Sequence, residues 1–187
     1  MIIGLTGSFG AGKGTVVEYL IERAGFSHYS ASGFITEEIV RRGMPVNRDS
    51  MIEVSNDLRA TFGPSHIIDS LYERAKEKGG DAIIESLRAV AEVRRIKELG
   101  GVVIGVDADP RIRYERSVTR GSEKDDVSFE KWRDQEQQES NPDDPTKQDI
   151  FGSLRESDYL VNNNGTREEL EEQIEAVLAE IRAASER

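Results

Sequence analysis

The sequence predicts an α/β protein of three layers (α/β/α), in which helices cover both faces of a five-stranded parallel sheet and a polar lid insert interrupts the second half of the chain. Two observations predict this class. Five short runs rich in Ile, Val and Tyr alternate with helical segments, which is typical of parallel sheets with right-handed crossovers. A glycine-rich turn follows the first run directly, and ligands of open parallel sheets bind beyond the carboxyl ends of the strands.

Length and composition favour a single domain. The 187 residues are 36% hydrophobic, enough for one good-sized core. No 18-residue apolar stretch and no signal peptide are present, so the expected location is the cytoplasm. The absence of cysteine excludes disulfides and cysteine–zinc sites. A net charge of −11 repels nucleic acid and anionic membranes, so neither is expected as a partner; monomer and homodimer both stay open.

The first element is a buried strand at residues 1–5, and a helix follows at 15–23. The glycines between them let backbone N–H groups close around an anion, and the helix N-terminus adds free N–H donors. Lys13 supplies a full positive charge for the outer phosphates of a nucleotide, and is expected to be catalytic. We therefore predict a phosphate-binding loop made of Gly7, Ser8, Gly10, Ala11, Gly12, Lys13, Gly14 and Thr15.

Helices dominate the next part of the chain. A short strand at 26–30 leads into a helix at about 32–42, which Gly43 and Pro45 end. Two further helices, at about 49–61 and 65–78, are separated by Gly63-Pro64. We expect the helices of residues 31–78 to bind the second substrate, with Ser32, Arg41 and Arg59 as contacts and Arg42 and Arg48 as further candidates; exposed arginines of purely structural role are equally common.

The second half continues the alternation. Strands are predicted at 81–86 and 102–107, each followed by a helix, at 88–99 and at about 110–120. A last strand at 159–162 precedes an amphipathic helix, whose apolar stripe indicates core packing. His28 and His66 are expected to be structural.

A polar and acidic insert is predicted at 121–145, between core segments 1–120 and 146–187. It contains a helix at about 128–139, which Phe129 and Trp132 are expected to pack against the core. Because the insert has few apolar residues, we expect it to dock weakly and to act as a lid that excludes water when it closes.

Arginines near strand ends are the candidate catalytic residues, because phosphoryl transfer needs positioning and positive charge more than covalent help. Glu85 lies near the end of the strand predicted at 81–86 and Arg88 follows that strand by two residues, where it could clamp a phosphate; a structural Glu85–Arg88 pair is the alternative. Arg116 and Arg120 lie one helical turn apart at the start of the insert, with surface salt bridges as the alternative. Arg111 and Arg113 are expected at the surface.

Several of these motifs resemble one family. The Gly-Lys-Gly-Thr ending of the loop resembles adenylate kinase and the other nucleoside monophosphate kinases of the P-loop superfamily, as do Ile84–Arg88 and Tyr114–Gly121. The resemblance implies that Arg116 lies against adenine and that Arg120 reaches the phosphates. The turn at 162–165, with Asn164, could lie beside the adenine, or its residues could serve the turn alone. The resemblance also implies an ATP-bound Mg²⁺ held mainly by phosphates and water, with Thr15 and Glu85 contributing.

The sequence as a whole therefore favours an ATP-dependent phosphotransferase acting on a nucleoside or deoxynucleoside monophosphate. The end of the chain, 158–166, also resembles dephospho-coenzyme A kinase, so transfer to a hydroxyl is one alternative. A nucleotide-binding ATPase or switch without an acceptor is the other.

Overall fold

A computed structural model of the chain describes residues 1–119, 127–138, 140–141, 144 and 147–185. Its centre is a sheet of five parallel strands in the order β2-β3-β1-β4-β5, as predicted in class and number. This order places β1 in the middle, so the loop that follows it lies at the centre of the carboxyl edge. The strands are β1 (Ile2–Gly7), β2 (Ser27–Ser30), β3 (Ala82–Leu87), β4 (Val102–Asp107) and β5 (Tyr159–Asn162).

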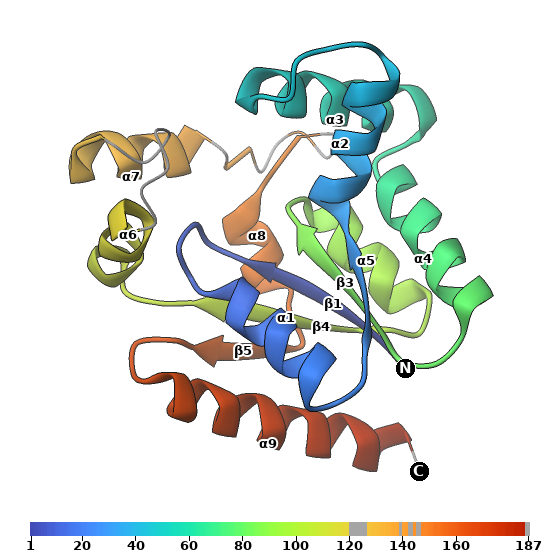
Figure 1. Ribbon diagram of the computed structural model, residues 1–187, viewed down its shortest axis with the longest axis vertical. Helices are drawn as coiled ribbons and strands as arrows, with labels where there is room; N and C mark the ends of the chain where they lie inside the picture. Colours follow the sequence, from blue (N-terminus) through green and yellow to red (C-terminus); the bar gives the residue numbers. More distant parts are fainter. Residues whose placement is uncertain (120–126, 139, 142–143, 145–146, 186–187) are drawn as a thin grey trace.

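Helices cover both faces of the sheet (Figure 1). On one face lie α1 (Lys13–Glu22) and α9 (Arg167–Ser185); on the other lie α4 (His66–Lys78), α5 (Val90–Glu98) and α8 (Ile150–Arg155). Successive residues of a strand point to opposite faces, so Ile83 packs in the core beneath α1 and α9 while Ile84 packs in the opposite core.

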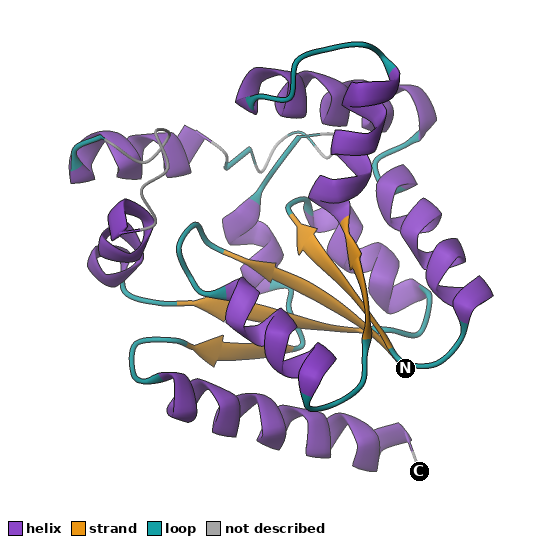
Figure 2. Ribbon diagram, viewed as in Figure 1, coloured by secondary structure: helices purple, strands orange, loops and turns teal. Residues whose placement is uncertain are grey.

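The remaining helices lie around the carboxyl ends of the strands (Figure 2). They are α2 (Ala31–Arg41) and α3 (Arg48–Phe62), which follow β2, and α6 (Pro110–Thr119) and α7 (Phe129–Gln138), which follow β4. The loop after β1 thus has α2 and α3 on one side and α6 and α7 on the other. None of the helices in the described part of the chain has the length and apolar character needed to span a membrane.

The structure differs from the expected elements in two instructive places. Helix α5 begins at Val90, two residues after the predicted start at 88. Glu92 accepts the N–H groups of Arg88 and Ala89, and this cap sets the first turn of the helix at Val90. Helix α8 was not predicted. It has only six residues, too few for a visible period, and begins where Asp149 accepts the N–H of Gly152.

Candidate functional site

The segment Gly7–Thr15 closes into a loop between β1 and α1. Its backbone is left-handed at Gly10 (φ 71°) and at Gly12 (φ 95°). A Cβ atom at Gly10 would lie 2.3 Å from the carbonyl oxygen of Arg113, and one at Gly12 would lie 2.1 Å from Nδ2 of Asn163. Glycine is therefore required at both positions, because the φ angles are positive and because other parts of the chain leave no room for a Cβ atom. A loop with such glycines can close its backbone around an anion.

Lys13 folds back over this loop. Its Nζ donates to the carbonyl oxygens of Gly7 at 2.7 Å and of Ser8 at 2.9 Å. The ammonium is thus held close to the N-terminus of α1, where its charge adds to the partial positive charge of the helix end. The result is a concentration of positive charge in a chain whose net charge is −11.

A cavity of about 690 Å³ opens beside the loop, between α1 and α6. It is lined by the predicted residues Gly10–Thr15, Glu85 and Arg116. Gly7 and Ser8 are not among its lining residues; Ser8 is fully buried, and its Oγ has no hydrogen-bond partner among the described residues. No motif marked the other lining residues, which α1 and α6 bring together: Glu18, Ile112, Glu115 and Thr119.

The turn after β5 supports the loop, through a different asparagine from the one predicted. Nδ2 of Asn163, a buried residue, donates to the carbonyl oxygen of Ala11 at 2.8 Å, and Nη1 of Arg116 donates to the carbonyl oxygen of Asn163. Asn164, the predicted residue, instead accepts the N–H of Asp109. Three consecutive asparagines mark the turn in the sequence, but nothing local tells which of them faces the loop.

Glu85 lies at the carboxyl end of β3, in the same cavity. Its carboxylate accepts the hydroxyls of Ser30 and Ser86, each at 2.5 Å, and Ser30 is 3.0 Å from Ser32. His28 Nε2 lies 3.7 Å from Glu85, so the fold supplies the carboxylate neighbour that the sequence did not reveal for this histidine. The turn from Ser30 to Ser32, which includes the predicted contact Ser32, is therefore hydrogen-bonded to Glu85.

The backbone next to Glu85 is strained. Ser86 has φ 69°, and it is the residue at which the pairing register of β1 and β3 shifts: Leu5 pairs with Glu85, but Thr6 pairs with Leu87. A positive φ in a residue other than glycine costs about 1–3 kcal/mol and is concentrated at functional sites. This bulge turns the end of β3.

A second groove, of about 580 Å³, adjoins this turn along α2. Its lining is mainly apolar and carries no cationic side chain among the described residues; it comprises Ser30, Ser32, Gly33, Thr36, Glu37 and Val40. Arg88 lies near the other side of the loop, where its guanidinium carbon is 5.3 Å from the centre of the Phe9 ring. The predicted Ser32 thus lines a groove next to Glu85, and Arg88 lies beside the loop.

The arginines expected at the acceptor site are engaged elsewhere. Arg41 pairs with Glu38 at 2.7 Å and is largely exposed. Arg59 is 2% exposed, and its Nη2 lies 2.8 Å from the carboxylate of Glu92. This differs from the expectation that Arg59 would line the acceptor site, because the arginine is drawn into the interior by a carboxylate of α5. The side chain of Arg48 and the whole of Arg120 lie outside the described residues.

The two arginines that bind the Glu38 carboxylate lower its pKa. Hydrogen bonds from Arg41 and Arg42 lower the pKa of Glu38 from its ordinary value of 4.5 to about 2. Arg42 also bridges to Asp57 of α3 at 2.7 Å, so this cluster joins α2 to α3.

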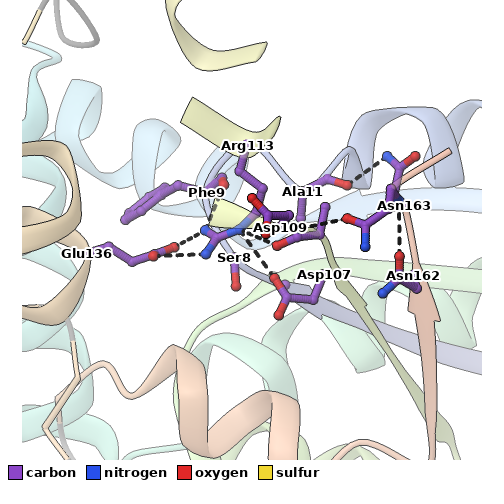
Figure 3. Close-up of polar contacts among 12 residues, drawn as sticks. Ser8, Phe9, Ala11, Asp107, Asp109, Arg113, Glu136, Asn162 and Asn163 are labelled. Carbon is purple, nitrogen blue, oxygen red and sulfur yellow. Dashed lines mark hydrogen bonds and ion pairs between the residues drawn. The ribbon is translucent and has the colours of Figure 1, made fainter. Parts of the chain in front are cut away.

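Arg113, expected at the surface, is 2% exposed and lies against the loop (Figure 3). Its guanidinium donates to the carbonyl oxygens of Phe9 at 3.1 Å and Ala108 at 2.9 Å, and it makes a two-point ion pair with Glu136 of α7. Asp107 at the end of β4 lies 3.4 Å from the same guanidinium. One buried cation therefore joins the loop, β4, α6 and α7.

Helix α7 docks more firmly than its composition suggested. Trp132 is 4% exposed and stacks with Phe129, as expected, and both rings contact Tyr114 of α6. Glu136, on the same helix, is 2% exposed. The expectation of weak docking is therefore wrong for α7. Most of the remaining predicted insert, including residues 121–126 and 142–143, lies outside the described residues.

The described residues contain no group of three or more His, Cys, Asp or Glu side chains placed to hold a metal ion. The donor set fits an ion that keeps most of its waters and binds through phosphates, as Mg²⁺ does. Thr15 and Glu85, the two predicted contacts, line the same cavity.

Comparison with known proteins places this geometry in context. A family model described as an AAA domain (AAA_18) matches residues 3–141. The UPF0200 protein TK1334 of Thermococcus kodakarensis is 29% identical over 188 residues, covering 97% of this chain and 98% of the relative. The UPF0200 protein PAE1629 of Pyrobaculum aerophilum is 30% identical over 184 residues, covering 97% and 98%.

Solved structures share the fold at low identity. TT1252 from Thermus thermophilus is 21% identical with a TM-score of 0.64, covering 96% of this chain and 97% of that one. A shikimate kinase from Bacteroides thetaiotaomicron (14%, TM-score 0.55, coverage 97% and 98%) and a dephospho-CoA kinase from Campylobacter jejuni (16%, TM-score 0.54, coverage 98% and 98%) are also similar. The predicted resemblance is confirmed at the level of fold: the chain has the three-layer fold of the P-loop kinases.

Proposed function

We propose that this chain, which belongs to the UPF0200 family and carries an AAA domain of the AAA_18 family, is an ATP-dependent phosphotransferase acting on a small molecule. The observation that carries the proposal is one cavity lined both by Gly10–Thr15 and by Glu85. The glycine-rich segment suits a nucleotide polyphosphate. Glu85, near the end of β3, and Arg88, directly after β3, suit the second reactant. We further propose a single domain in which α2–α4 bind the acceptor and the insert covers the site.

The donor is proposed to bind with its β- and γ-phosphates in the loop. Lys13 would leave the Gly7 and Ser8 carbonyls and contact the outer phosphates, because a phosphate is a stronger partner for an ammonium than a neutral carbonyl is. Arg116 lines the same cavity beside Asn163, where it would contact the base.

Charge in this cavity favours the magnesium complex of ATP over free ATP. Among the described residues, the lining has two cationic side chains, Lys13 and Arg116, against three carboxylates, Glu18, Glu85 and Glu115. Free ATP would therefore meet more carboxylates than cationic side chains in this part of the cavity. A divalent ion bridging the phosphates supplies the missing positive charge and stabilises the charge that develops during transfer.

We propose a nucleoside or deoxynucleoside monophosphate as the acceptor. Ser32 lines the groove next to Glu85, Arg88 lies beside the loop, and Arg41 is in a largely exposed pair with Glu38. Arg42 also pairs with Glu38, so an incoming phosphate can bind Arg41 while the carboxylate keeps a cationic partner. The terminal phosphoryl group of ATP would move to an oxygen of the acceptor phosphate, giving ADP and a diphosphate.

A hydroxyl acceptor is the second candidate, and the surroundings of Glu85 favour it. Its carboxylate is held in place by two serine hydroxyls, with His28 at 3.7 Å, so it is positioned to receive the proton of a hydroxyl bound in the cavity. The adjoining groove offers mainly apolar surface and no cation among the described residues. In this reaction the acceptor oxygen attacks the γ-phosphorus, its proton passes to Glu85, and ADP leaves.

One experiment separates these reactions. The whole protein is incubated with magnesium and γ-labelled ATP, first alone and then with panels of nucleoside monophosphates and of hydroxyl-bearing metabolites. Label in a nucleoside diphosphate supports the first candidate, and label in a phosphate ester supports the second. Label only in free phosphate, or no release at all, contradicts both. Glu85→Gln separates them further, because loss of a base slows transfer to a hydroxyl far more than transfer to an ionised phosphate.

A further inference from the structure

Two carbonyl groups of the phosphate-binding loop point outward and are held from outside. Nη1 of Arg113 donates to the carbonyl oxygen of Phe9 at 3.1 Å, and Nδ2 of Asn163 donates to that of Ala11 at 2.8 Å (Figure 3). Both donors are buried and come from different elements, α6 and the turn after β5. The loop is therefore supported on two sides by side chains that do not belong to it.

The direction of these bonds determines where the loop's own donors point. In a trans peptide the C=O and the following N–H point in opposite directions, and the described chain contains no cis peptide. When the Phe9 carbonyl turns toward Arg113, the N–H of Gly10 is turned away from it; the Ala11 carbonyl and the N–H of Gly12 are related in the same way. No acceptor among the described residues takes either N–H, and both glycines line the cavity.

We propose that Arg113 and Asn163 are positioning residues that keep the Gly10 and Gly12 N–H groups directed at the phosphates, and that Glu136 of α7 acts through Arg113. The inference rests on the proposed nucleotide-binding function. Glu136 fixes the guanidinium through both Nη1 and Nη2, and Nη1 is the nitrogen that also donates to the Phe9 carbonyl. Docking of α7 and phosphate affinity are thereby coupled through a single buried cation.

Packing adds a reason why this support cannot shift freely. A Cβ at Gly10 would lie 2.3 Å from the Arg113 carbonyl oxygen, and Ser117 Oγ donates to that same oxygen at 2.9 Å. The loop therefore touches the backbone of α6 as well as the guanidinium. Displacement of Arg113 moves a surface against which the loop is packed.

The test measures binding of two ligands, ATP and inorganic tripolyphosphate, to the full-length protein in the presence of magnesium. Tripolyphosphate has no base and probes the loop alone. For Arg113→Gln we expect both ligands to weaken by the same factor, about tenfold, the value of one hydrogen bond to a charged donor. Glu136→Gln should give a smaller loss in the same direction, and Asn163→Ala a loss comparable to that of Arg113→Gln.

Glu130→Gln is the matched control, because it removes the same charge from an exposed position of α7; its affinities should equal those of the wild type. Thermal unfolding identifies any variant that fails to fold, in which case Glu136→Gln and Asn163→Ala carry the test. A folded Arg113→Gln protein whose tripolyphosphate affinity equals that of the wild type overturns the inference, even if ATP binding weakens, because the arginine would then only support α6. A wild-type protein that binds neither ligand overturns the proposed function, and this inference with it.

Discussion

Replacement of Arg59 by methionine is expected to destabilise the protein by about 3–5 kcal/mol, because it leaves a buried carboxylate without its cation. Nε and Nη2 of Arg59 donate to Oε1 of Glu92 at 3.0 and 2.8 Å, and both side chains are at most 2% exposed. The other oxygen of Glu92 accepts the N–H groups of Arg88 and Ala89. The loss would be at least about a fifth of the stability of a typical domain, which is about 5–15 kcal/mol.

Urea denaturation of four proteins measures this: the wild type, Arg59→Met, Glu92→Gln and the double variant. Glutamine keeps an oxygen that can cap α5, so Glu92→Gln mainly leaves the Arg59 charge unpaired. The double variant buries no unpaired charge, and it should therefore be more stable than the sum of the single losses predicts, by about 1–3 kcal/mol. Arg167→Met is the control; its pair with Glu171 is half-exposed, and the expected change is about 0.5 kcal/mol or less.

The same variant also tests the role that the sequence suggested for Arg59. If Arg59→Met unfolds at the same urea concentration as the wild type and instead raises KM for the acceptor, the reasoning from burial is refuted. In that case the guanidinium leaves Glu92 in solution and binds the second substrate.

Three further results are expected. Lys13→Ala should reduce kcat about hundredfold, since it removes a charge that faces the transferred group; wild-type affinity and turnover would contradict the proposed function. Gly10→Ala should weaken ATP binding more than tenfold in a calorimetric titration, because φ 71° and a backbone oxygen 2.3 Å from the new Cβ both oppose alanine. The pKa of Glu38 lies near 2 instead of 4.5, so its carboxylate stabilises the fold above about pH 4.5, and that stability is lost as the pH falls toward 2. Glu38→Gln should therefore show a smaller drop in melting temperature than the wild type between pH 6 and pH 3, and equal drops would contradict this.

The sequence was sufficient for the elements whose signal is local. The strands Val102–Asp107 and Tyr159–Asn162 were predicted with the bounds that the structure has, because each is a short apolar run with polar neighbours. The phosphate-binding loop was predicted for a similar reason. Its glycines and its lysine are contiguous, so their chemistry can be recognised without knowledge of the fold.

The misses involve partners that are distant in the chain. Arg113 is buried because Glu136, 23 residues later, and the Phe9 carbonyl, 104 residues earlier, meet it. Arg59 is buried because Glu92 lies opposite it in another helix. An arginine is exposed by default, and only the fold shows which ones have a carboxylate within reach. Asn163 was missed for the opposite reason: the sequence marked the turn but could not tell its members apart.

The docking of α7 changes what the insert can be expected to do. Its few apolar residues suggested that opening would cost little, but the contact consists of one aromatic cluster and one buried ion pair rather than an apolar stripe. Undocking of α7 would carry Glu136 into solvent and leave the buried guanidinium of Arg113 without its ion-pair partner, so the docked position is favoured. A motion that carried α7 away from α6 would also remove the carboxylate that fixes this guanidinium at the Phe9 carbonyl. Nucleotide binding and docking of α7 should therefore favour each other, and a movement that admits substrate costs least when it leaves this helix in place.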